Sequence, residues 1–209
     1  MTISYAITVC NEFKEVKRLI TLLNEFVRDE DEIVVLFDKG KGTAEVWSYL
    51  QFCLQEYKNI KVKAKTFKNH FAEWKNYLST LCSKDYIFQL DADEIPNRVL
   101  LEALPTILET NPDNEVYMVP RVNTVKGLTE AHINKWSWRV DKRGWVNWPD
   151  YQLRIWKNKK EIYWTNKVHE TLFGYETYAP LPKAEQYALY HPKDIERQEK
   201  ANDYYDTLI

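Results

Sequence analysis

The sequence predicts an α/β fold in which parallel strands form a sheet flanked by helices. Three observations indicate this class. Apolar segments of strand length alternate with helical segments over residues 3–110. Each predicted strand in this region is followed by polar residues, as happens where a parallel sheet presents its carboxyl edge to a ligand. Hydrophobic residues make up 44% of the chain, which is enough to bury a core.

The first half alternates strand and helix in order. Val16, Leu19 and Leu23 have the spacing of one face of a helix. Thr43 is a residue type that caps helices, and it precedes the second helical segment. The predicted strands cover residues 3–9, 32–37, 60–67 and 86–90, and the predicted helices cover residues 13–27, 43–57, 71–82 and 98–110.

After residue 111 the pattern changes to strands and clustered aromatic residues. No linker composition separates the two parts, so we expect one domain over residues 1–209 with an amino-terminal half (1–110) and a carboxy-terminal half (111–209). The predicted elements of the second half are a strand over 115–122, two segments that alternate like paired strands over 152–156 and 162–164, and a charged terminal helix over 194–209.

The bulk properties exclude several functional classes. A net charge of −2 does not suit a chain-wide electrostatic binder of nucleic acid. The three cysteines lack C-x-x-C spacing, which argues against a zinc knuckle, a redox pair or a disulfide framework. Residues 1–10 do not resemble a signal peptide, and no apolar segment reaches the roughly 18 residues of a membrane span. We expect a cytoplasmic protein, at most peripheral to a membrane.

Polar residues, most of them acidic, follow the predicted strands: Asn11 and Glu12, Asp38, and Asp91 with Asp93. Because these strand ends share one edge of a parallel sheet, we expect an acidic crevice there. At strand period Asp91 and Asp93 share a face, and two such carboxylates repel unless a cation lies between them. Oxygen ligands select Mg²⁺ or Mn²⁺, which keep coordination positions for substrate phosphates. A solvated acidic turn is the alternative interpretation.

Several segments carry motifs that occur together in one family. They are residues 3–12, residues 33–43, residues 69–76, Asp91-Ala92-Asp93-Glu94, Val168-His169-Glu170 and Tyr190-His191-Pro192-Lys193. Together they resemble family 2 glycosyltransferases of the GT-A fold, in particular a branch with D-A-D-E and V-H-E motifs that includes lipopolysaccharide-core sugar transferases. The last segment resembles a late histidine-containing turn of that branch. The resemblance implies a Rossmann-like, mixed but mostly parallel sheet flanked by helices.

The resemblance also implies roles for individual residues. Three residues of the amino-terminal half, Asn11, Glu12 and Asp38, would line the pocket for the base and ribose of a nucleotide-sugar donor. Asp91 would face the ribose or the metal. The remaining implied roles are metal binding by Asp93, metal or diphosphate binding by His191, and positions near the donor for Lys75 and Asn76. The chain departs from the family pattern at Lys39 and Lys41, where an acidic, serine-rich turn is usual, and at Lys75, where arginine is usual.

The function that follows is an inverting, metal-dependent transfer of a hexose-type sugar from a nucleoside-diphosphate donor, UDP in the first place, to an acceptor hydroxyl. The amino-terminal half would bind the donor and the carboxy-terminal half the acceptor. A carboxylate must take the proton of the acceptor hydroxyl. Glu170 is the first candidate for this general base and Asp150 the second. The acceptor is open between a glycan, a lipid-linked sugar, a protein and a modified DNA base, and a virus-encoded enzyme would act in the host cytoplasm.

Four tryptophans, at 136, 138, 145 and 148, lie close to Arg139 and Arg143 and allow three interpretations. Trp145 and Trp148, together with His169, would form an acceptor wall on which a sugar stacks. The aromatic residues would otherwise be ordinary packing, or they would stack nucleic-acid bases. Two rival functions stay open at this point. One is a nucleotidyltransferase, which also uses paired carboxylates and a metal, and the other is a non-catalytic domain that binds sugar or nucleic acid.

Overall fold

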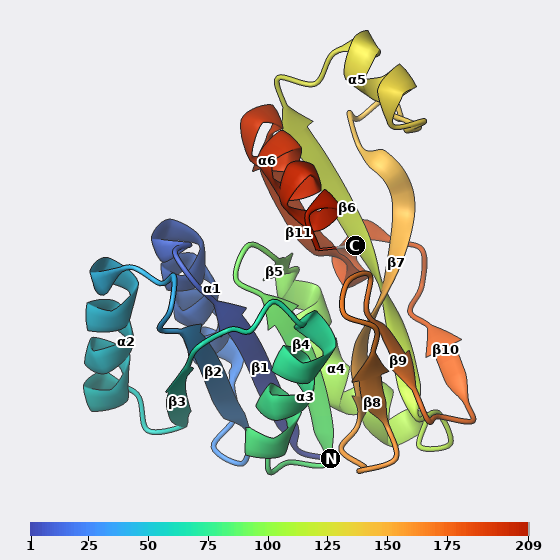
Figure 1. Cartoon of the computed structure of the whole chain (residues 1–209). Helices are drawn as coiled ribbons and strands as arrows, with labels where there is room; N and C mark the ends of the chain where they lie inside the picture. The colour runs from blue at the N-terminus through green and yellow to red at the C-terminus, as the bar shows by residue number, and fades with distance from the viewer. Residues whose placement is uncertain (209) are drawn as a thin grey trace.

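The computed structural model describes residues 1–208, and its elements follow the predicted alternation (Figure 1). Each predicted helix and strand of the first half is present within a few residues of its expected ends. The strands and helices of that half are β1 (Ile3–Val9), α1 (Phe13–Phe26), β2 (Glu32–Asp38), α2 (Ala44–Glu56), β3 (Ile60–Lys65), α3 (Phe71–Leu81), β4 (Tyr86–Asp91), β5 (Ile95–Pro96) and α4 (Arg98–Thr110).

The second half contains long strands that extend the same sheet. The elements are β6 (Val116–Lys126), α5 (Glu130–Lys135), β7 (Val146–Lys157), β8 (Tyr163–Thr165), β9 (Thr171–Phe173), β10 (Tyr178–Pro180), a 3₁₀ turn (Glu185–Tyr187), β11 (Leu189–Asp194) and α6 (Ile195–Asp206). The predicted terminal helix covered 194–209, and its last residue lies outside the described part of the chain. Within that part, no helix combines the length and the apolar character needed to cross a membrane.

The main sheet has nine strands in the order β3-β2-β1-β4-β7-β6-β11-β5, with β10 paired to β6. Strands β3, β2, β1 and β4 are parallel to one another, whereas β7 is antiparallel to both β4 and β6. β11 returns the sheet to parallel pairing on β6. The predicted fold class, a mixed and mostly parallel sheet flanked by helices, is therefore confirmed.

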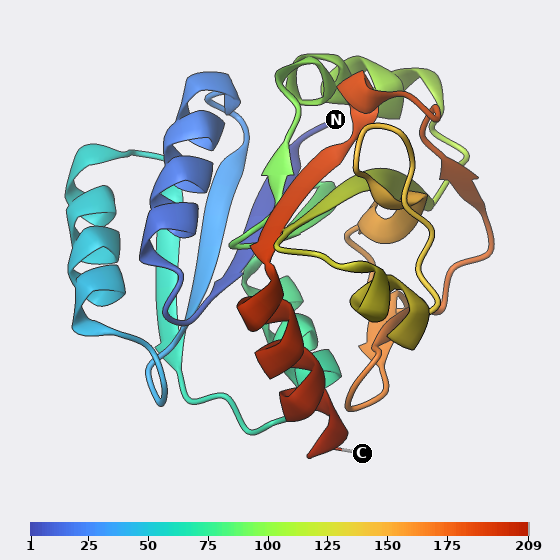
Figure 2. The same cartoon turned by 90° about the horizontal axis from the view of Figure 1, so that it is seen from above.

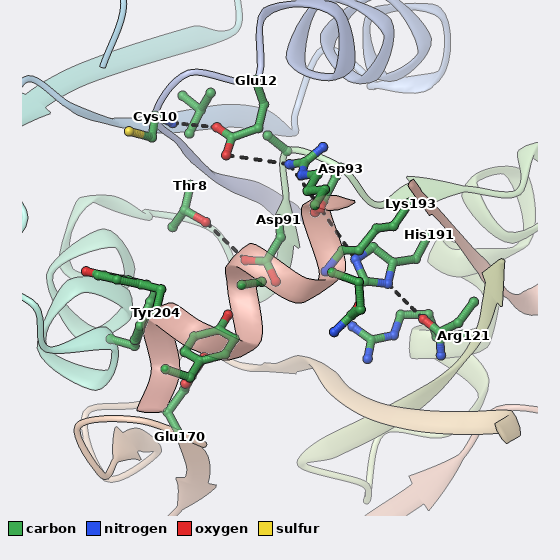
Figure 3. Close-up of a pocket in the computed structure, with 18 of the residues that line it drawn as sticks. Thr8, Cys10, Glu12, Asp91, Asp93, Arg121, Glu170, His191, Lys193 and Tyr204 are labelled. Atoms are coloured by element: carbon green, nitrogen blue, oxygen red, sulfur yellow. Dashed lines mark hydrogen bonds and ion pairs between the residues drawn. The ribbon is translucent and has the colours of Figure 1, made fainter. Parts of the chain in front are cut away.

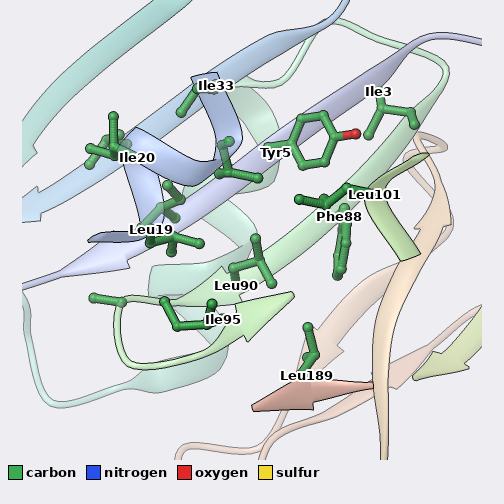
Figure 4. Packing of buried hydrophobic residues seen from close by; sticks show 14 of the residues in the cluster. Ile3, Tyr5, Leu19, Ile20, Ile33, Phe88, Leu90, Ile95, Leu101 and Leu189 are labelled. Atoms are coloured by element: carbon green, nitrogen blue, oxygen red, sulfur yellow. The ribbon is translucent and has the colours of Figure 1, made fainter. Parts of the chain in front are cut away.

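Helices cover both faces of this sheet (Figure 2). On one face residues of α1, α2 and α4 share one core with Ile3, Tyr5 and Ile7 of β1, and Figure 4 shows part of this larger core. On the other face α3 and the β8–β9 hairpin pack against Ala6 and Trp156. Each large aliphatic side chain that is fully buried in this way contributes about 1.5–3 kcal/mol. The start of α2 is the predicted one, because the Thr43 hydroxyl caps the helix by accepting a hydrogen bond from the Val46 amide.

One pairing expectation was wrong. Residues 152–156 and 162–164 do not pair with each other, because β7 lies between β4 and β6 while β8 pairs with β9. Ile155 and Trp156 are adjacent in β7 and buried in the cores on opposite faces of the sheet. A strand that is buried on both faces belongs in the middle of a sheet, where it needs two partner strands.

Candidate active site

The main cavity of the molecule, of about 650 Å³, lies at the carboxyl ends of β1, β2 and β4. Residues of β6 and β11 form one side of it, and Gln198, Ala201, Tyr204 and Tyr205 of α6 line it as well. Figure 3 shows this pocket, with Cys10 and Glu12 toward one end and Arg121, His191 and Lys193 on one side. This is the edge at which the sequence predicted a ligand site, and such edges bind ligands in open α/β sheets.

Asp91 is the last residue of β4, and its carboxylate is held by the protein on both oxygens. Oδ1 accepts hydrogen bonds from the Thr8 hydroxyl at 3.1 Å and the Gln89 amide at 3.0 Å, and Oδ2 lies 2.8 Å from Arg154. Burial alone raises the pKa of Asp91, but the nearby cations of Lys75 and Arg154 outweigh it and hold that pKa far below its usual range. Asp91 is therefore an anion whose position is fixed.

A buried network of charges supports this aspartate. Arg154, about one-twentieth exposed, donates to Glu94 from Nε at 2.9 Å and from its second terminal nitrogen at 2.7 Å. Arg121 continues the chain by contacting Glu94 at 2.9 Å and Asp150 at 2.7 Å. Sequence reasoning missed both arginines. A signal existed, because Arg154 interrupts an apolar strand and an arginine there must find an acidic partner.

Asp93 lies just beyond β4, in a turn, so the strand-period argument that placed it on the same face as Asp91 does not apply. Its Oδ2 is 3.4 Å from His191 Nε2 and 3.3 Å from Arg197. Burial raises the pKa of Asp93, but the hydrogen bond and charge of His191 outweigh it and bring that pKa down to about 2.

The orientation of the His191 ring follows from its neighbours. Nδ1 lies 2.7 Å from Asn123 Oδ1, and the Asn123 amide nitrogen donates to Asp150 at 2.7 Å. The amide oxygen of Asn123 must then accept, so Nδ1 of His191 carries a hydrogen, an assignment made from the network. In the neutral ring Nε2 presents a lone pair to the Asp93 carboxylate. A cation, either a proton on the ring or a metal ion, resolves that repulsion.

His191 was expected in a late turn, and this was wrong. It lies in β11, where it pairs with Asn123 of β6. The parallel ladder places His191 and Lys193 on one face of β11, since alternate side chains of a strand share a face. Both side chains therefore point to the cavity, and both line it.

Asp93 and His191 could supply two ligands to a divalent cation, but not a complete coordination shell. A carboxylate oxygen and an imidazole nitrogen whose other nitrogen donates a hydrogen bond form a usual pair of ligands for Mn²⁺. Over residues 1–208, however, His, Cys, Asp and Glu do not gather in groups of three or more able to hold a metal. An ion here would thus take its remaining ligands from substrate phosphates and water, as Mg²⁺ commonly does. Asp91 already accepts hydrogen bonds from Thr8 and Gln89 on Oδ1 and from Arg154 on Oδ2.

The two candidate bases have different surroundings. The Asp150 carboxylate accepts hydrogen bonds from Arg121, Asn123 and Gln152. Burial raises the pKa of Asp150, but Arg121 and Asn123 outweigh it, and the net pKa is lowered. Glu170 has one oxygen, Oε1, at 2.5 Å from the Lys75 ammonium. Its Oε2 makes no hydrogen bond to the described residues, so it is the better placed of the two to accept a proton.

Two of the three residues expected at the nucleoside end of the donor line the main cavity, and the third does not. Glu12 and Asp38 line the cavity, whereas Asn11 is exposed and does not belong to the described lining. Glu12 accepts the Cys10 amide at 2.8 Å, and Asp38 accepts the Gly40 and Phe67 amides. Asn76 is used to hold β8, because its side chain makes two hydrogen bonds with the backbone of Trp164.

The two tryptophans expected to bind the acceptor do not line the main cavity. Trp145 and Trp148 pack edge to face at 5.0 Å in a small apolar cluster with Val122, Ala188 and Tyr190. Neither belongs to the described lining of the main cavity, which instead includes Trp138 and Trp74. His169 lies beside Glu170, at the wall of a neighbouring cavity.

The expectation of an acidic crevice needs correction. Five lysine and arginine side chains line the main cavity together with the carboxylates: Lys41, Lys75, Arg121, Lys193 and Arg197. The acidic strand ends are therefore balanced by cations from α3, β6, β11 and α6. Sequence reasoning placed Lys75 near the donor but did not identify Arg121, Lys193 and Arg197 as cavity residues, because cations spread over distant segments have no common spacing. Arg197 is an example, since it reaches from α6 to Glu12 at 3.7 Å and to Asp93.

Comparison with solved structures agrees with this architecture. The structure of residues 1–349 of S. aureus TarS superposes with a TM-score of 0.65 at 15% identity, covering 92% of this chain and 60% of that one. A complex of the same fragment with UDP-GlcNAc gives the same TM-score and identity and is covered to 59%. The longer TarS structure gives a TM-score of 0.66 at 16% identity and is covered to 37%. This chain thus spans about 60% or less of these proteins.

The sequence itself is matched by a family model. Residues 4–176, from β1 to beyond β9, match the model described as glycosyl transferase family 2. The matched region contains Asp38, Asp91, Asp93 and Glu170, and its GT-A type sheet is the one expected of the family. The chain belongs to glycosyl transferase family 2.

Proposed function

We propose that this protein transfers a hexose-type sugar from a UDP-sugar to an acceptor hydroxyl with inversion of configuration. The observation that carries the proposal is the pairing of Asp93 with His191 at 3.4 Å on the wall of the main cavity, at the carboxyl edge of the parallel strands. Family membership and the UDP-GlcNAc complex of TarS support a nucleotide-sugar donor. A cavity of about 650 Å³ lies within the usual range for ligand sites.

In this proposal Asp93 and His191 hold Mn²⁺ or Mg²⁺ together with the donor diphosphate. The ion, when bound, supplies Lewis-acid stabilisation of the charge that develops on the leaving group. Lys193 and Arg197 lie on the same wall and add fixed positive charge toward the phosphates. Glu12 and Asp38 bind the nucleoside end, because they line the cavity at the ends of β1 and β2.

The reaction needs one proton acceptor. The acceptor oxygen forms a bond to the anomeric carbon while the bond from that carbon to the diphosphate oxygen breaks, and the electron pair leaves with UDP. The proton of the acceptor hydroxyl goes to Oε2 of Glu170. Lys75 holds the other oxygen at 2.5 Å and so fixes the direction of the base. Asp150 is the second candidate, but four hydrogen bonds from three residues already occupy its carboxylate.

The proposal also divides the chain as one domain with two roles. Residues 1–110 bind the nucleoside end of the donor, and residues 111–209 contribute the acceptor side, including Glu170. His191, Lys193 and Arg197 of the second half also face the donor diphosphate. The lining of the main cavity supports this scheme, because Glu12 and Asp38 lie at the strand ends of the first half.

A thermal-shift panel of UDP-GlcNAc, UDP-glucose and GDP-mannose, with Mn²⁺ or with EDTA, tests the proposal. A ligand at 100 times its dissociation constant should stabilise the protein by about 2.7 kcal/mol. We expect stabilisation by a UDP-sugar that requires Mn²⁺ and is lost in Asp93→Asn. Glu102→Gln, at an exposed position on α4, is the matched control and should behave as wild type. Free UDP should appear slowly in the same mixtures.

Two results would overturn the proposal. If no nucleotide sugar stabilises the protein with either ion, the donor assignment is wrong. If pyrophosphate rather than UDP is released from a sugar phosphate and UTP, the site performs nucleotidyl transfer instead. Equal stabilisation with Mn²⁺ and with EDTA would remove only the metal from the scheme.

A further inference from the structure

The outer side of α2 differs from that of α1 and α4, the helices that share its core. Both charged residues of α2, Glu45 and Glu56, lie at its ends, and the stretch 46–55 between them carries no charge. By comparison, four of the six exposed residues of α1 and three of the six of α4 are charged. Helix α2 therefore presents an uncharged face, although the outer side of a surface helix is normally charged or polar.

Three large apolar side chains on this face are open to solvent. Trp47 is 37% exposed, Phe52 50% and Leu54 42%, which makes α2 the element with the most exposed large hydrophobic residues in the described part of the chain. Trp47 also stacks on Phe37 at 5.3 Å, and this contact fixes the orientation of its indole ring. Helix α2 is the outermost element on its side in Figures 1 and 2, so no described element covers the face.

Lysines surround the uncharged face. Lys39 and Lys41 precede the amino end of α2, and Lys58 follows its carboxyl end. Only one lysine of the segment 39–68, Lys61, takes part in an ion pair within residues 1–208. This segment contains two acidic residues and seven lysines, although acidic residues outnumber basic ones in the whole chain. The lysines are Lys39, Lys41, Lys58, Lys61, Lys63, Lys65 and Lys68.

Protection of a sheet edge explains only part of this pattern. β3 is an edge strand, and lysines on edge strands discourage pairing with another chain. That role accounts for Lys61, Lys63 and Lys65, which alternate along β3. It does not account for Lys39 or Lys58, which lie outside the strand, or for the lack of charge on α2. The helix face and its lysines therefore need a common explanation.

The arrangement favours one kind of partner. A second copy of the chain is disfavoured, because a symmetric contact would bring this lysine-rich surface against itself. A nucleic acid needs cations across the contact to match its phosphates, whereas the centre of this surface is uncharged and its cations lie at the rim. An anionic lipid surface fits both parts. Aromatic and aliphatic side chains enter the headgroup region of such a surface, and lysines at the rim reach lipid phosphates.

We propose that α2 and its surrounding lysines form a docking surface for an anionic lipid bilayer. The helix lies in the plane of the interface, with Trp47, Phe52 and Leu54 among the headgroups. Lys39 and Lys58, at the two ends of the helix, contact lipid phosphates. Lys41 also belongs to the lining of the main cavity, so the docked protein holds one wall of that cavity close to the lipid. The inference goes beyond the proposed function and does not depend on it.

Vesicle flotation of the whole chain tests this surface. The vesicles are phosphatidylcholine alone and phosphatidylcholine with about 30% phosphatidylglycerol, whose anionic headgroups attract lysines. We expect binding to the mixed vesicles only, and weaker binding as salt is raised, because salt screens charges at the surface. Sedimentation velocity and titration with a short DNA duplex, both without vesicles, test the two other partners.

Two double variants separate the apolar and the charged contributions. Phe52→Ser with Leu54→Ser removes apolar contact, and Lys39→Gln with Lys58→Gln removes charge. Each pair should weaken vesicle binding by about tenfold or more. The matched controls are Val99→Ser, at a side chain 43% exposed on α4, and Lys160→Gln, at an exposed position after β7. Both controls should bind vesicles as wild type does.

Tryptophan fluorescence locates the contact. Vesicles whose acyl chains carry bromine quench tryptophans that enter the bilayer. Wild type should be quenched by brominated anionic vesicles, and Trp47→Phe should lose most of that quenching. If Trp47→Phe floats with the vesicles but is quenched as strongly as wild type, another surface enters the lipid and the proposal is wrong.

Other results would also overturn the proposal. They are a failure to bind anionic vesicles, equal binding to both kinds of vesicle, and double variants that bind as their controls do. DNA binding without vesicle binding would assign the surface to nucleic acid. A dimer that is lost in the Phe52 and Leu54 variant, again without vesicle binding, would assign it to a second copy. If circular dichroism shows that this variant does not fold, the lysine variant and Trp47→Phe decide the question.

Discussion

The ammonium of Lys75 lies 2.5 Å from Oε1 of Glu170, at the boundary between the main cavity and the neighbouring cavity. Lys75 is only about 5% exposed, and its ammonium also lies 4.7 Å from the centre of the Trp164 ring. The pair therefore fixes the direction of the Glu170 carboxylate relative to both cavities. A substitution of Glu170 is therefore the best way to separate effects on turnover from effects on donor binding.

Glu170→Gln should lower kcat by roughly 10²-fold or more, because a general base contributes about 10²–10⁴-fold to such a step. The affinity for the UDP-sugar should stay near that of wild type, since the base acts on the acceptor. Steady-state kinetics and donor titration measure the two quantities. Asp150→Asn is the informative companion. Normal turnover in Glu170→Gln together with its loss in Asp150→Asn would move the base to Asp150.

Asp38→Ala should raise the KM for the donor and leave the KM for the acceptor unchanged. The reason is its position at the end of β2 on the wall of the main cavity, away from the neighbouring cavity. Asp113→Ala, at an exposed loop position, is the control for general effects of removing a carboxylate. A change confined to the acceptor constant would contradict the assignment of residues 1–110 to the donor.

Arg154→Met should destabilise the fold by about 3–5 kcal/mol, since it leaves Asp91 and Glu94 as buried charges without their partner. Urea unfolding measures this difference. Arg98→Met is the matched control, because Arg98 is 64% exposed in its pair with Glu25 and exposed pairs contribute about 0–1 kcal/mol. Equal effects of the two substitutions would mean that the buried network does not stabilise the protein.

Acid should destabilise the protein partly through Asp93. Its pKa falls from the ordinary 3.8 to about 2 in the folded chain. A lowered folded pKa adds stability that is fully present above 3.8 and is lost as the pH falls toward 2. A shift of this size corresponds to about 2 kcal/mol. Denaturant titrations should therefore show a smaller loss of stability between pH 5 and pH 2, a range that brackets both values, in Asp93→Asn than in wild type. Identical pH profiles would contradict the linkage.

Much of the fold could be predicted because it depends on local patterns. The spacing of Val16, Leu19 and Leu23 on α1 and the apolar run of β4 each reflect burial of one element, which periodicity reports. The partners of β7 could not be predicted in this way. Pairing depends on residues far away in the chain, and the same alternating segment fits a hairpin and a central strand equally well.

The candidate site was predictable only where chemistry is concentrated in a short motif. Asp91, Asp93 and His191 were identified from such motifs and line the main cavity. Arg154 and Arg121 were not, because their role comes from the partners that the fold brings to them. Tyr205 was hidden in a terminal segment whose composition indicated only a charged helix.

The last helix, α6, has a consequence for the order of events during synthesis. The main cavity is lined by residues from Thr8 in β1 to Tyr205 in α6. Domains generally fold as units during synthesis. A nascent chain that has released only β1 to β4 from the ribosome lacks β6, β7 and β11 of the sheet, and it lacks His191, Arg197 and Tyr205 of the cavity wall. The cavity should therefore be completed only after α6 has left the ribosome, and a ribosome-stalled chain that exposes residues 1–185 should not bind a UDP-sugar.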